Sequence, residues 1–333
     1  MNSAEKSYLF CTTRCGFERK DKYIARFLRF FGTVRNFGSM KFFKTTLISG
    51  LVVVLCVAAF TGVFKYYQTA SSPRQTVRAD GARVHVEELS FFDGMDKTYG
   101  KLYRPADDTL GKHPVIIFCH GISVNADWFD TYCRSAAAKG YYAYAFDFKG
   151  GSPTSRSTGL STMKMTVDSE KEDLLFVLKR IRHESFTDKS KVFIAGHSLG
   201  GLVAALAAKE SRRDIAGLIL LSPAFNIVDM AQEFYPKLRQ VKDTTDLLGT
   251  PLGKKFFTEL RGFDPYKWLP RYQRPVLLIE GENDNTVPPA YVEKAFEKFG
   301  TAEYELIPNT GHTFKGSDAD VRRRVHAWLD RQL

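Results

Sequence analysis

Ser198 has the sequence surroundings of a nucleophile. It lies in Gly196-His-Ser-Leu-Gly200, between an apolar run and the Ala-rich stretch 202–208. Gly-x-Ser-x-Gly alone can arise by chance in a Gly-rich turn, but the flanking residues here predict a buried strand, a sharp turn and a helix. The glycines let backbone pass close to the turn, and a helix N-terminus favours negative charge. This context predicts that the Ser198 hydroxyl attacks a carbonyl carbon.

A serine hydroxyl needs a base, and the base needs a carboxylate that fixes its tautomer. In this arrangement the two partners follow the serine along the chain, acid first and histidine second, on loops after late strands. Asp284 follows one late apolar run, and His312 follows the next. Glu282 and, more distantly, Asp229 remain alternatives for the acid. The order of residues therefore predicts a triad of Ser198, Asp284 and His312.

The tetrahedral intermediate of such a reaction carries a negative oxygen that needs two hydrogen-bond donors. The backbone N–H of Leu199, directly after the serine, is expected to be one of them. The N–H of Ile122, in the loop after the apolar run 115–119, is expected to be the other.

The other histidines are weaker candidates for the base. Most precede the serine or belong to other motifs. His326 follows the serine but lies in the final amphipathic stretch, where a structural role is expected. They are His85, His113, His120, His183, His197 and His326. His120 is expected to donate structural hydrogen bonds rather than to carry a proton.

Alternating strands and helices must position these residues. Short apolar runs alternate with amphipathic stretches from about residue 84 to the C-terminus. Strands are predicted at 84–92, 99–104, 115–119, 142–146, 191–195, 217–221, 276–280 and 304–307, and helices near 127–139, 167–183, 199–209, 290–299 and 318–332. The first two strands should form an antiparallel pair across the Asp93-Gly94 turn. The alternation predicts one doubly wound, mostly parallel α/β sheet.

The interval of about 225–274 interrupts this alternation. It is long and rich in aromatic residues, so a helical cap insertion is expected rather than a structureless loop. Such a cap should shape an apolar pocket for an acyl or aromatic group.

From about residue 84 onward the chain resembles the α/β-hydrolase superfamily, and within it the monoacylglycerol-lipase-like and cinnamoyl or feruloyl-esterase-like hydrolases. The motifs that carry the resemblance are Cys119-His-Gly-Ile122, Phe146-Asp-Phe-Lys-Gly150, Gly196-His-Ser-Leu-Gly200, Leu221-Ser-Pro-Ala224, Gly281-Glu-Asn-Asp284 and Gly311-His312. Lys149-Gly-Gly-Ser-Pro153 departs from the Gly-His-Gly-x-Ser that is frequent in such enzymes.

The resemblance implies a serine hydrolase that cleaves small-molecule or lipid carboxylic esters through an acyl-enzyme and needs no cofactor or metal. A peptidase or amidase with the same triad stays open. So does a non-catalytic, membrane-tethered binding protein of this fold.

The N-terminal 64 residues differ in composition from the rest of the 333-residue chain. Residues 1–46 carry ten Lys and Arg against three acids, so they account for +7 of the net charge of +11. Residues 47–64 are uncharged and, as a helix, would span roughly 27 Å, close to a bilayer's hydrocarbon thickness. This pattern predicts a transmembrane helix rather than a nucleic-acid-binding surface.

The positive flank predicts a cytoplasmic tail at 1–46, and the catalytic part outside the cytoplasm. Residues 65–82 should form a linker to a hydrolase domain at 83–333. Secretion after cleavage of a signal peptide is the alternative. Translation could begin at Met1 or at Met40.

The five cysteines do not form a disulfide framework. Cys11 and Cys15 lie in the basic tail with no histidine or second cysteine pair nearby, so no zinc site is expected, and Cys56 lies in the apolar segment. A bridge between Cys119 and Cys133 stays open in an oxidising compartment, but the apolar run around Cys119 favours a buried thiol.

Overall fold

The computed structural model of the chain describes residues 75–79, 82–107 and 111–333. They belong to one compact unit, Tyr66–Leu333. The expected basic tail (1–46) and membrane helix (47–64) lie outside the described residues. No helix within the described ranges is long and apolar enough to cross a bilayer.

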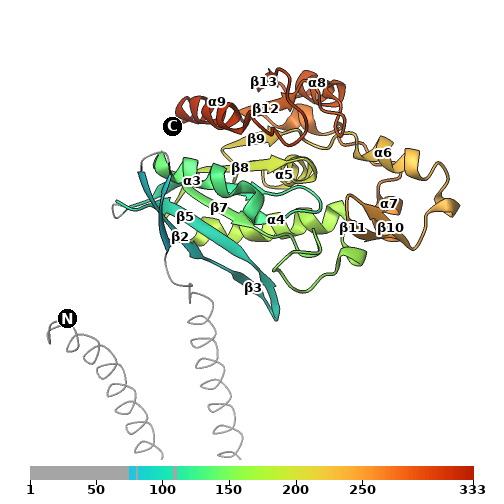
Figure 1. Ribbon diagram of the computed structural model, residues 1–333, viewed down its shortest axis with the longest axis horizontal. Helices are drawn as coiled ribbons and strands as arrows, with labels where there is room; N and C mark the ends of the chain where they lie inside the picture. The colour runs from blue at the N-terminus through green and yellow to red at the C-terminus, as the bar shows by residue number, and fades with distance from the viewer. Residues whose placement is uncertain (1–74, 80–81, 108–110) are drawn as a thin grey trace, which may run out of the picture. The chain divides into compact units, whose positions relative to one another are not determined.

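A nine-stranded sheet forms the centre of this unit (Figure 1). Three strands at one edge run antiparallel to their neighbours, and the other six run parallel to one another. In spatial order the strands are β1 (Gln75–Ala79), β2 (Ala82–Glu88), β5 (Gly100–Pro105), β7 (Tyr142–Phe146), β6 (His113–Cys119), β8 (Thr187–His197), β9 (Gly217–Leu221), β12 (Val276–Gly281) and β13 (Ala302–Ile307). The predicted doubly wound, mostly parallel sheet is confirmed.

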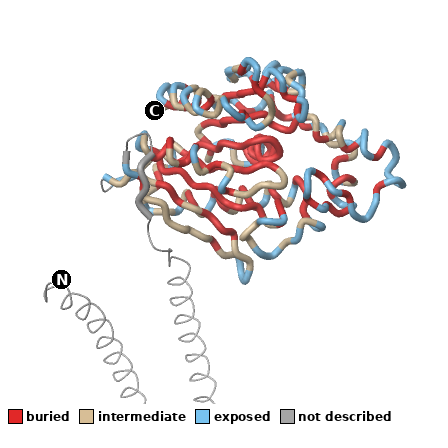
Figure 2. Tube along the Cα trace, in the orientation of Figure 1, coloured by how far each residue is buried: buried red, intermediate tan, exposed pale blue. Residues whose placement is uncertain are grey.

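Helices cover both faces of the sheet. They are α3 (Asp130–Ala138), α4 (Val167–His183), α5 (Leu199–Glu210), α8 (Pro289–Lys298) and α9 (Asp318–Asp330). In β6, Val115 and Ile117 pack with α4, α5 and α8, whereas Ile116 and Phe118 pack with α3 and α9. Successive side chains of a strand point to opposite faces, so an apolar run without alternation marks a strand buried on both sides. Figure 2 shows these strands and α5 as the buried centre.

Helix α4 begins where its sequence predicts. The Thr166 hydroxyl accepts a hydrogen bond from the Ser169 N–H at 3.1 Å, and the Ser169 hydroxyl accepts one from the Thr166 N–H at 2.9 Å. This capping box supplies a partner for an N–H group that the first turn leaves unpaired.

The N-terminal strands differ from the prediction. Residues 75–79, expected as part of the linker, form β1, paired antiparallel with β2. An edge strand needs no continuous apolar run, so its polar sequence gave no strand signal. The predicted strand 84–92 ends earlier, at Glu88, and Phe91–Asp93 (β3) pairs with Asp96–Thr98 (β4) in a separate hairpin around Gly94.

The insertion at 225–274, called the cap below, is only partly helical. Its helices are short and include α6 (Ile227–Phe234) and α7 (Lys254–Glu259). The expectation of a helical insertion is wrong for β10 (Thr244–Leu247) and β11 (Thr250–Gly253), which form a hairpin. Leu248 and Gly249 at its tip both have positive φ, 52° and 85°, as a tight two-residue hairpin turn requires.

Candidate active site

Ser198 lies at the sharp turn between β8 and α5. Its backbone has φ 54° and ψ −123°, a strained conformation for a residue with a side chain. Two backbone hydrogen bonds hold it. The Ser198 N–H donates to the Leu221 carbonyl at 2.9 Å, and the Ala224 N–H donates to the Ser198 carbonyl at 2.9 Å. The turn that the sequence predicts around the serine is therefore present.

The two glycines that flank the serine are required by space. A Cβ atom on Gly196 would lie 2.3 Å from the Gly200 carbonyl oxygen, and one on Gly200 would lie 2.3 Å from the carbonyl oxygen of Cys119. Both contacts are with backbone, which cannot rotate away as a flexible side chain can. The turn thus packs directly against the end of β6.

Ser198, His312 and Asp284 form one hydrogen-bonded chain. The distance from His312 Nε2 to Ser198 Oγ is 3.0 Å, and that from His312 Nδ1 to Asp284 Oδ2 is 2.7 Å. Asp284 follows β12 and His312 follows β13, and the two loops are joined because the Asn283 N–H donates to the Thr310 carbonyl at 2.8 Å. The structure thus brings together the three side chains predicted as a triad.

The environment of Asp284 favours its ionised form. Its side chain is buried, which by itself raises a carboxyl pKa, but hydrogen bonds from His312 and from the Val287 N–H outweigh burial and hold the pKa of Asp284 below its usual range. The N–H groups of Thr286 and Val287 each donate to Oδ1 at 2.8 Å. A carboxylate that is held in this way can fix the tautomer of His312 and stabilise the imidazolium.

The two alternative acids lie elsewhere. Glu282 accepts a hydrogen bond from the Asn309 N–H at 2.9 Å, and Asp229, on α6, accepts one from the Tyr291 hydroxyl at 2.9 Å. Neither carboxylate is hydrogen bonded to His312.

The loop after β6 lies against the serine. A Cβ atom on Gly121 would be 3.0 Å from the Cβ of Ser198. Among the described residues, neither the Ile122 nor the Leu199 N–H donates a hydrogen bond to another group of the chain. Both N–H groups are therefore available to an oxyanion.

His120 stabilises this loop. Its Nε2 accepts a hydrogen bond from the Phe148 N–H at 3.0 Å, so the ring proton is on Nδ1, which donates to the Gly121 carbonyl at 2.8 Å. Burial lowers the pKa of His120. The ring is neutral and structural, as its place in the sequence indicated.

His197 supports the loop of His312. Its Nε2–H donates to the His312 carbonyl at 2.9 Å, and its ring stacks on Trp128 with centroids 4.1 Å apart. Burial, and secondarily repulsion by His312, lower the pKa of His197 to about 3. His197 therefore stays neutral near pH 7 and acts as a fixed donor.

Charged side chains join the loops after β6 and β7. The buried carboxylate of Asp147 accepts hydrogen bonds from the Ala126 N–H at 2.9 Å and from the guanidinium of Arg156 at 2.8 Å. Lys149, where the chain departs from the motif of similar enzymes, donates its N–H to Asp173 at 2.8 Å. These contacts connect the loop after β7 to the segment after β6 and to α4.

Sequence reasoning missed one buried group beside the triad, Glu280 at the end of β12. It accepts hydrogen bonds from the Ser222 hydroxyl at 2.7 Å and from the Gly281 N–H at 2.8 Å. Burial raises the pKa of Glu280 to about 9. The available signal was an ionisable residue directly after the buried run Val276–Ile279.

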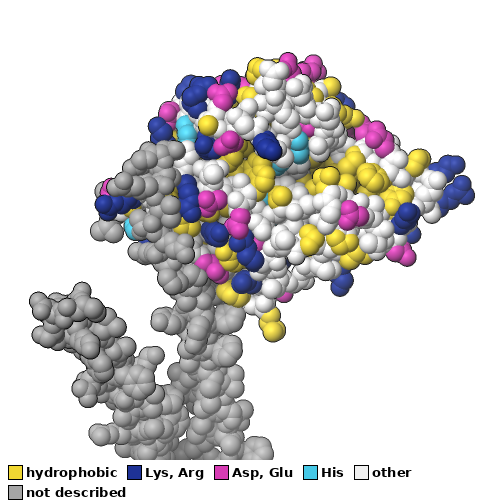
Figure 3. Space-filling view, viewed as in Figure 1, with side chains coloured by type: hydrophobic (Ala, Val, Ile, Leu, Met, Phe, Trp, Pro, Cys, Tyr) yellow, Lys and Arg dark blue, Asp and Glu magenta, His cyan; other side chains and the backbone are white. Residues whose placement is uncertain are grey.

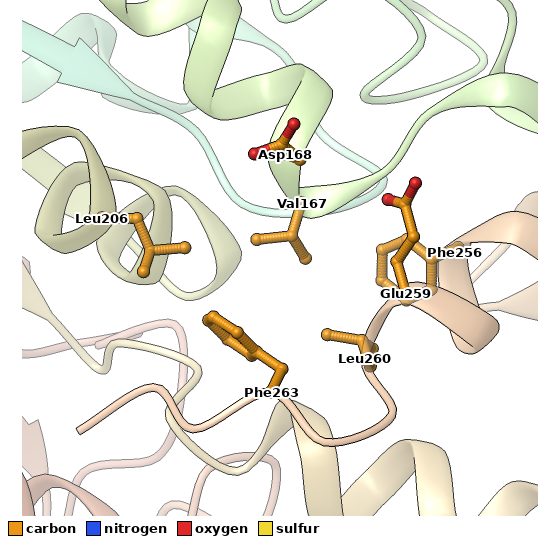
Figure 4. A pocket seen from close by; sticks show the side chains of 7 residues that line it. All are labelled: Val167, Asp168, Leu206, Phe256, Glu259, Leu260 and Phe263. Carbon is orange, nitrogen blue, oxygen red and sulfur yellow. The ribbon is translucent and has the colours of Figure 1, made fainter. Parts of the chain in front are cut away.

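The cap lines a half-open, largely apolar cavity of about 290 Å³ together with α4 and α5. In Figure 4 its apolar side chains point towards one another, and two carboxyl groups lie at its edge. The lining residues are Val167, Asp168, Leu206, Phe256, Glu259, Leu260 and Phe263. On the face shown in Figure 3, hydrophobic side chains gather in a band that extends towards the cap. None of the three triad side chains lines the cavity.

Comparisons with known proteins agree with this fold. A family model described as serine aminopeptidase, S33, matches residues 112–249. Protein bem46 of Schizosaccharomyces pombe is 30% identical over 161 residues, which cover 47% of this chain and 49% of that protein. The α/β-hydrolase domain-containing protein WAV2 of Arabidopsis thaliana is 28% identical over 130 residues, which cover 38% and 41%. The chain thus spans about half the length of these curated relatives, or less.

Solved structures match over most of their length. Est1E from Butyrivibrio proteoclasticus with bound ferulic acid has a TM-score of 0.64 at 22% identity, covering 78% of this chain and 98% of that one. A monoacylglycerol lipase from Paleococcus ferrophilus has a TM-score of 0.54 at 17% identity, covering 71% and 99%. With the strand order and the serine turn described above, these matches show that the chain has an α/β-hydrolase fold.

Proposed function

We propose that the chain is a serine hydrolase that cleaves carboxylic esters through an acyl-enzyme. The observation that carries the proposal is the chain of hydrogen bonds from Ser198 through His312 to Asp284, at 3.0 and 2.7 Å. This geometry matches a nucleophile, its base and the group that orients the base.

In the first half of the reaction, Ser198 Oγ attacks the ester carbonyl while His312 Nε2 takes its proton. The N–H groups of Leu199 and Ile122 donate to the oxyanion, and one such donor contributes about 3 kcal/mol to stabilisation of the transition state. The leaving alkoxide takes the proton from His312 as the C–O bond breaks. Asp284 stabilises the imidazolium until that transfer.

In the second half, water replaces the alcohol. His312 takes a proton from the water, and the resulting hydroxide attacks the acyl carbon. His312 then returns the proton to Ser198 Oγ, which releases the carboxylic acid. Each proton taken by His312 is given back, so no cofactor is consumed.

Ester hydrolysis is proposed rather than aminopeptidase activity because structural neighbours carry the names monoacylglycerol lipase and acetyl xylan esterase. The substrate comparison below distinguishes the two activities, because both can use the same triad.

A fluorophosphonate probe tests the proposal. The wild-type chain should be labelled on Ser198 and should hydrolyse esters faster than aminoacyl amides. Ser198→Ala should abolish labelling and lower kcat by at least about 10³-fold. Faster cleavage of the amides would favour a peptidase, and an unlabelled, inactive wild type would favour a binding protein.

We also propose that residues 47–64 anchor the domain in a membrane with the hydrolase part outside the cytoplasm. The membrane anchor is inferred from the uncharged run 47–64, which follows the basic stretch 1–46. The protein should stay in the membrane fraction after alkaline carbonate washing, and external protease should digest the hydrolase part. Release of a soluble form that begins after residue 64 would instead indicate cleavage and secretion.

A further inference from the structure

Ser123 directly follows the expected oxyanion donor Ile122 and has an unusual backbone conformation. Its φ is 68°, in the left-handed region that residues with a side chain seldom adopt. Such a conformation persists only where surrounding contacts hold it in place. The Ser123 N–H donates to the Gly151 carbonyl at 3.4 Å, which is long for a hydrogen bond, so the backbone supplies little of that support.

The side chain of Ser123 is bound by the hairpin of the cap. Its hydroxyl oxygen lies 3.2 Å from the carbonyl oxygen of Leu247 and 2.8 Å from the hydroxyl oxygen of Thr250. A carbonyl oxygen can only accept, so the Ser123 hydroxyl donates to Leu247 and accepts from Thr250. Leu247 ends β10 and Thr250 begins β11. The loop after β6 is therefore joined to the turn of the cap hairpin.

The Thr250 end of this link is held rigidly. Thr250 is 0% exposed, and within the described part of the chain its hydroxyl has no hydrogen-bond partner other than Ser123. The far end of β11 packs tightly on the core, because a Cβ atom on Gly253 would overlap the carbonyl oxygen of Met163. A buried hydroxyl that loses its partner is costly, so Thr250 holds Ser123 where it is.

Ile122 lies between two anchored residues. On one side Gly121 packs on Ser198, where a Cβ atom would come within 3.0 Å of the serine Cβ. On the other side Ser123 is bound to the cap. The Ile122 N–H donates to no other group among the described residues, so its direction depends on how these two neighbours are held.

We propose that Ser123 is a positioning residue, held by Leu247 and Thr250 of the cap, that keeps the Ile122 N–H aimed at the oxyanion. The inference rests on the proposed function. It gives the cap hairpin a part in the chemical step, in addition to the cavity that the cap lines. A donor that is fixed before the reaction needs no reorganisation when negative charge develops on the substrate oxygen.

Substitutions of the two hydroxyl residues test this role. Thr250→Val keeps the shape of the buried side chain and removes its hydroxyl. We expect it to lower kcat at least about tenfold and to change KM less than about twofold, because the oxyanion forms only after the substrate has bound. Ser123→Gly, which suits the positive φ but lacks the hydroxyl, should lower kcat in the same way. Thr250→Ser keeps the hydroxyl and should keep kcat within about threefold of wild type.

Thr245→Val is the matched control. Thr245 is also buried in this hairpin, but its hydroxyl is bonded to Tyr235 of the cap and not to the loop after β6. This variant loses the same kind of hydrogen bond, so it should lower the melting temperature as Thr250→Val does and yet keep kcat. An equal loss of kcat in both variants would show that the hairpin acts only through stability. That result, or an unchanged kcat in Thr250→Val, would overturn the proposal.

Two measurements need no substrate, so they separate this inference from the proposed function. Amide hydrogen exchange of residues 121–125 should become faster in Thr250→Val and stay unchanged in Thr245→Val. The double variant Ser123→Gly, Thr250→Val should lose less melting temperature than the sum of the two single variants, because both remove one shared bond. Additive losses with unchanged exchange would refute the inference even if esters are hydrolysed.

The opposite combination would identify a failure of the proposed function. If exchange and melting show the link but the chain neither reacts with a fluorophosphonate nor hydrolyses esters, the hydrolase assignment is wrong. The role of Ser123 in positioning an oxyanion donor then falls with it, although the bond between Ser123 and Thr250 stands.

Discussion

Asp284 acts on His312 through geometry as well as charge. Its Oδ2 lies 2.7 Å from Nδ1, so it requires a proton on that nitrogen and leaves Nε2 free to accept from Ser198. In Asp284→Asn the amide oxygen can still accept from the Thr286 and Val287 N–H groups. The amide nitrogen then faces His312 and favours the wrong tautomer, with the proton on Nε2.

We therefore expect Asp284→Asn to lower kcat by about 10³–10⁴-fold with an intact fold. Ester kinetics and circular dichroism measure the two effects. Asp229→Asn, which alters a carboxylate bonded to Tyr291, is the matched control and should keep its rate. Loss of activity in Asp229→Asn but not in Asp284→Asn would indicate that Asp229, in the cap, is the catalytic acid.

The triad residues can be identified from the sequence more readily than the side chains around them. Ser198, Asp284 and His312 each follow a predicted strand, and their order along the chain is informative by itself. Glu280 and Ser222 give no such signal, because their roles depend on which side chains meet after β9 and β12 pair. That pairing places the Ser222 N–H 2.8 Å from the Ile279 carbonyl, a contact between residues far apart in sequence.

At the scale of elements, the close approach of α5 to β6 positions the serine. A Cβ atom on Gly200 would meet two backbone oxygens, those of Cys119 and His120, at 2.3 and 2.4 Å. We expect Gly200→Ala to destabilise the fold by about 1–3 kcal/mol and to displace the loop that carries Ile122. Chemical denaturation and the rate of fluorophosphonate labelling measure these effects.

Gly300→Ala is the control for this change, because its nearest neighbour would be a side-chain atom 3.9 Å away. It should alter neither stability nor labelling. Equal stability of the two variants would mean that the turn relaxes more easily than its backbone contacts suggest.

The cap supplies the second prediction at this scale. The cavity reaches Leu206, eight residues along α5 from Ser198, a distance of roughly 12 Å along the helix. Only a long acyl group bound at the serine could extend that far. Phe263→Trp should fill the cavity and lower kcat/KM for long-chain esters at least tenfold while leaving short-chain esters unchanged, as a chain-length series would measure. Phe263→Leu, which enlarges the cavity, should not reduce long-chain activity.

Uninterrupted apolar runs predicted the central strands of the sheet, whereas β1 and the hairpin of the cap were missed. In β6, β7, β9 and β12 the runs 115–119, 142–146, 217–221 and 276–279 are uninterrupted by charged residues, so their composition alone indicates burial on both faces. In β10 only alternate residues, Thr245 and Leu247, are buried, and the turn of the hairpin, Leu248-Gly249, lacks an Asn-Gly signal. The helical expectation for the cap failed for this reason.

For the whole molecule, buried titratable groups set how stability depends on pH. His197 has its pKa lowered to about 3, so between pH 6.5 and 3 the unfolded chain binds a proton that the folded chain does not, and stability falls as pH falls. Glu280 has its pKa raised to about 9, so between pH 4.5 and 9 the folded chain retains a proton, and stability falls as pH rises.

The two slopes oppose each other where the windows overlap, so the free energy of unfolding should be greatest near pH 5–6. Each group contributes up to about 1.4 kcal/mol per pH unit within its window. Thermal melts from pH 4 to 9 would measure the curve. Burial raises the pKa of Asp173 to about 6 despite Lys149, so between pH 3.8 and 6 this group opposes the acid slope and moves the maximum set by His197 and Glu280 towards lower pH. The lowered pKa of Asp284 adds to the acid slope below pH 3.8.

Two variants test whether Glu280 and His197 cause the two slopes of the free energy of unfolding against pH. Glu280→Gln should flatten the alkaline side and leave the acid side steep, because the amide does not titrate. His197→Gln should do the reverse, since its amide N–H lies near the position of Nε2 and can still donate to the His312 carbonyl, but the amide gains no proton in acid. If neither variant changes the curve, the pH dependence arises from groups other than those buried around the active site. His197, which holds the loop of His312 in place, would then have no part in setting the pH range in which the folded molecule persists.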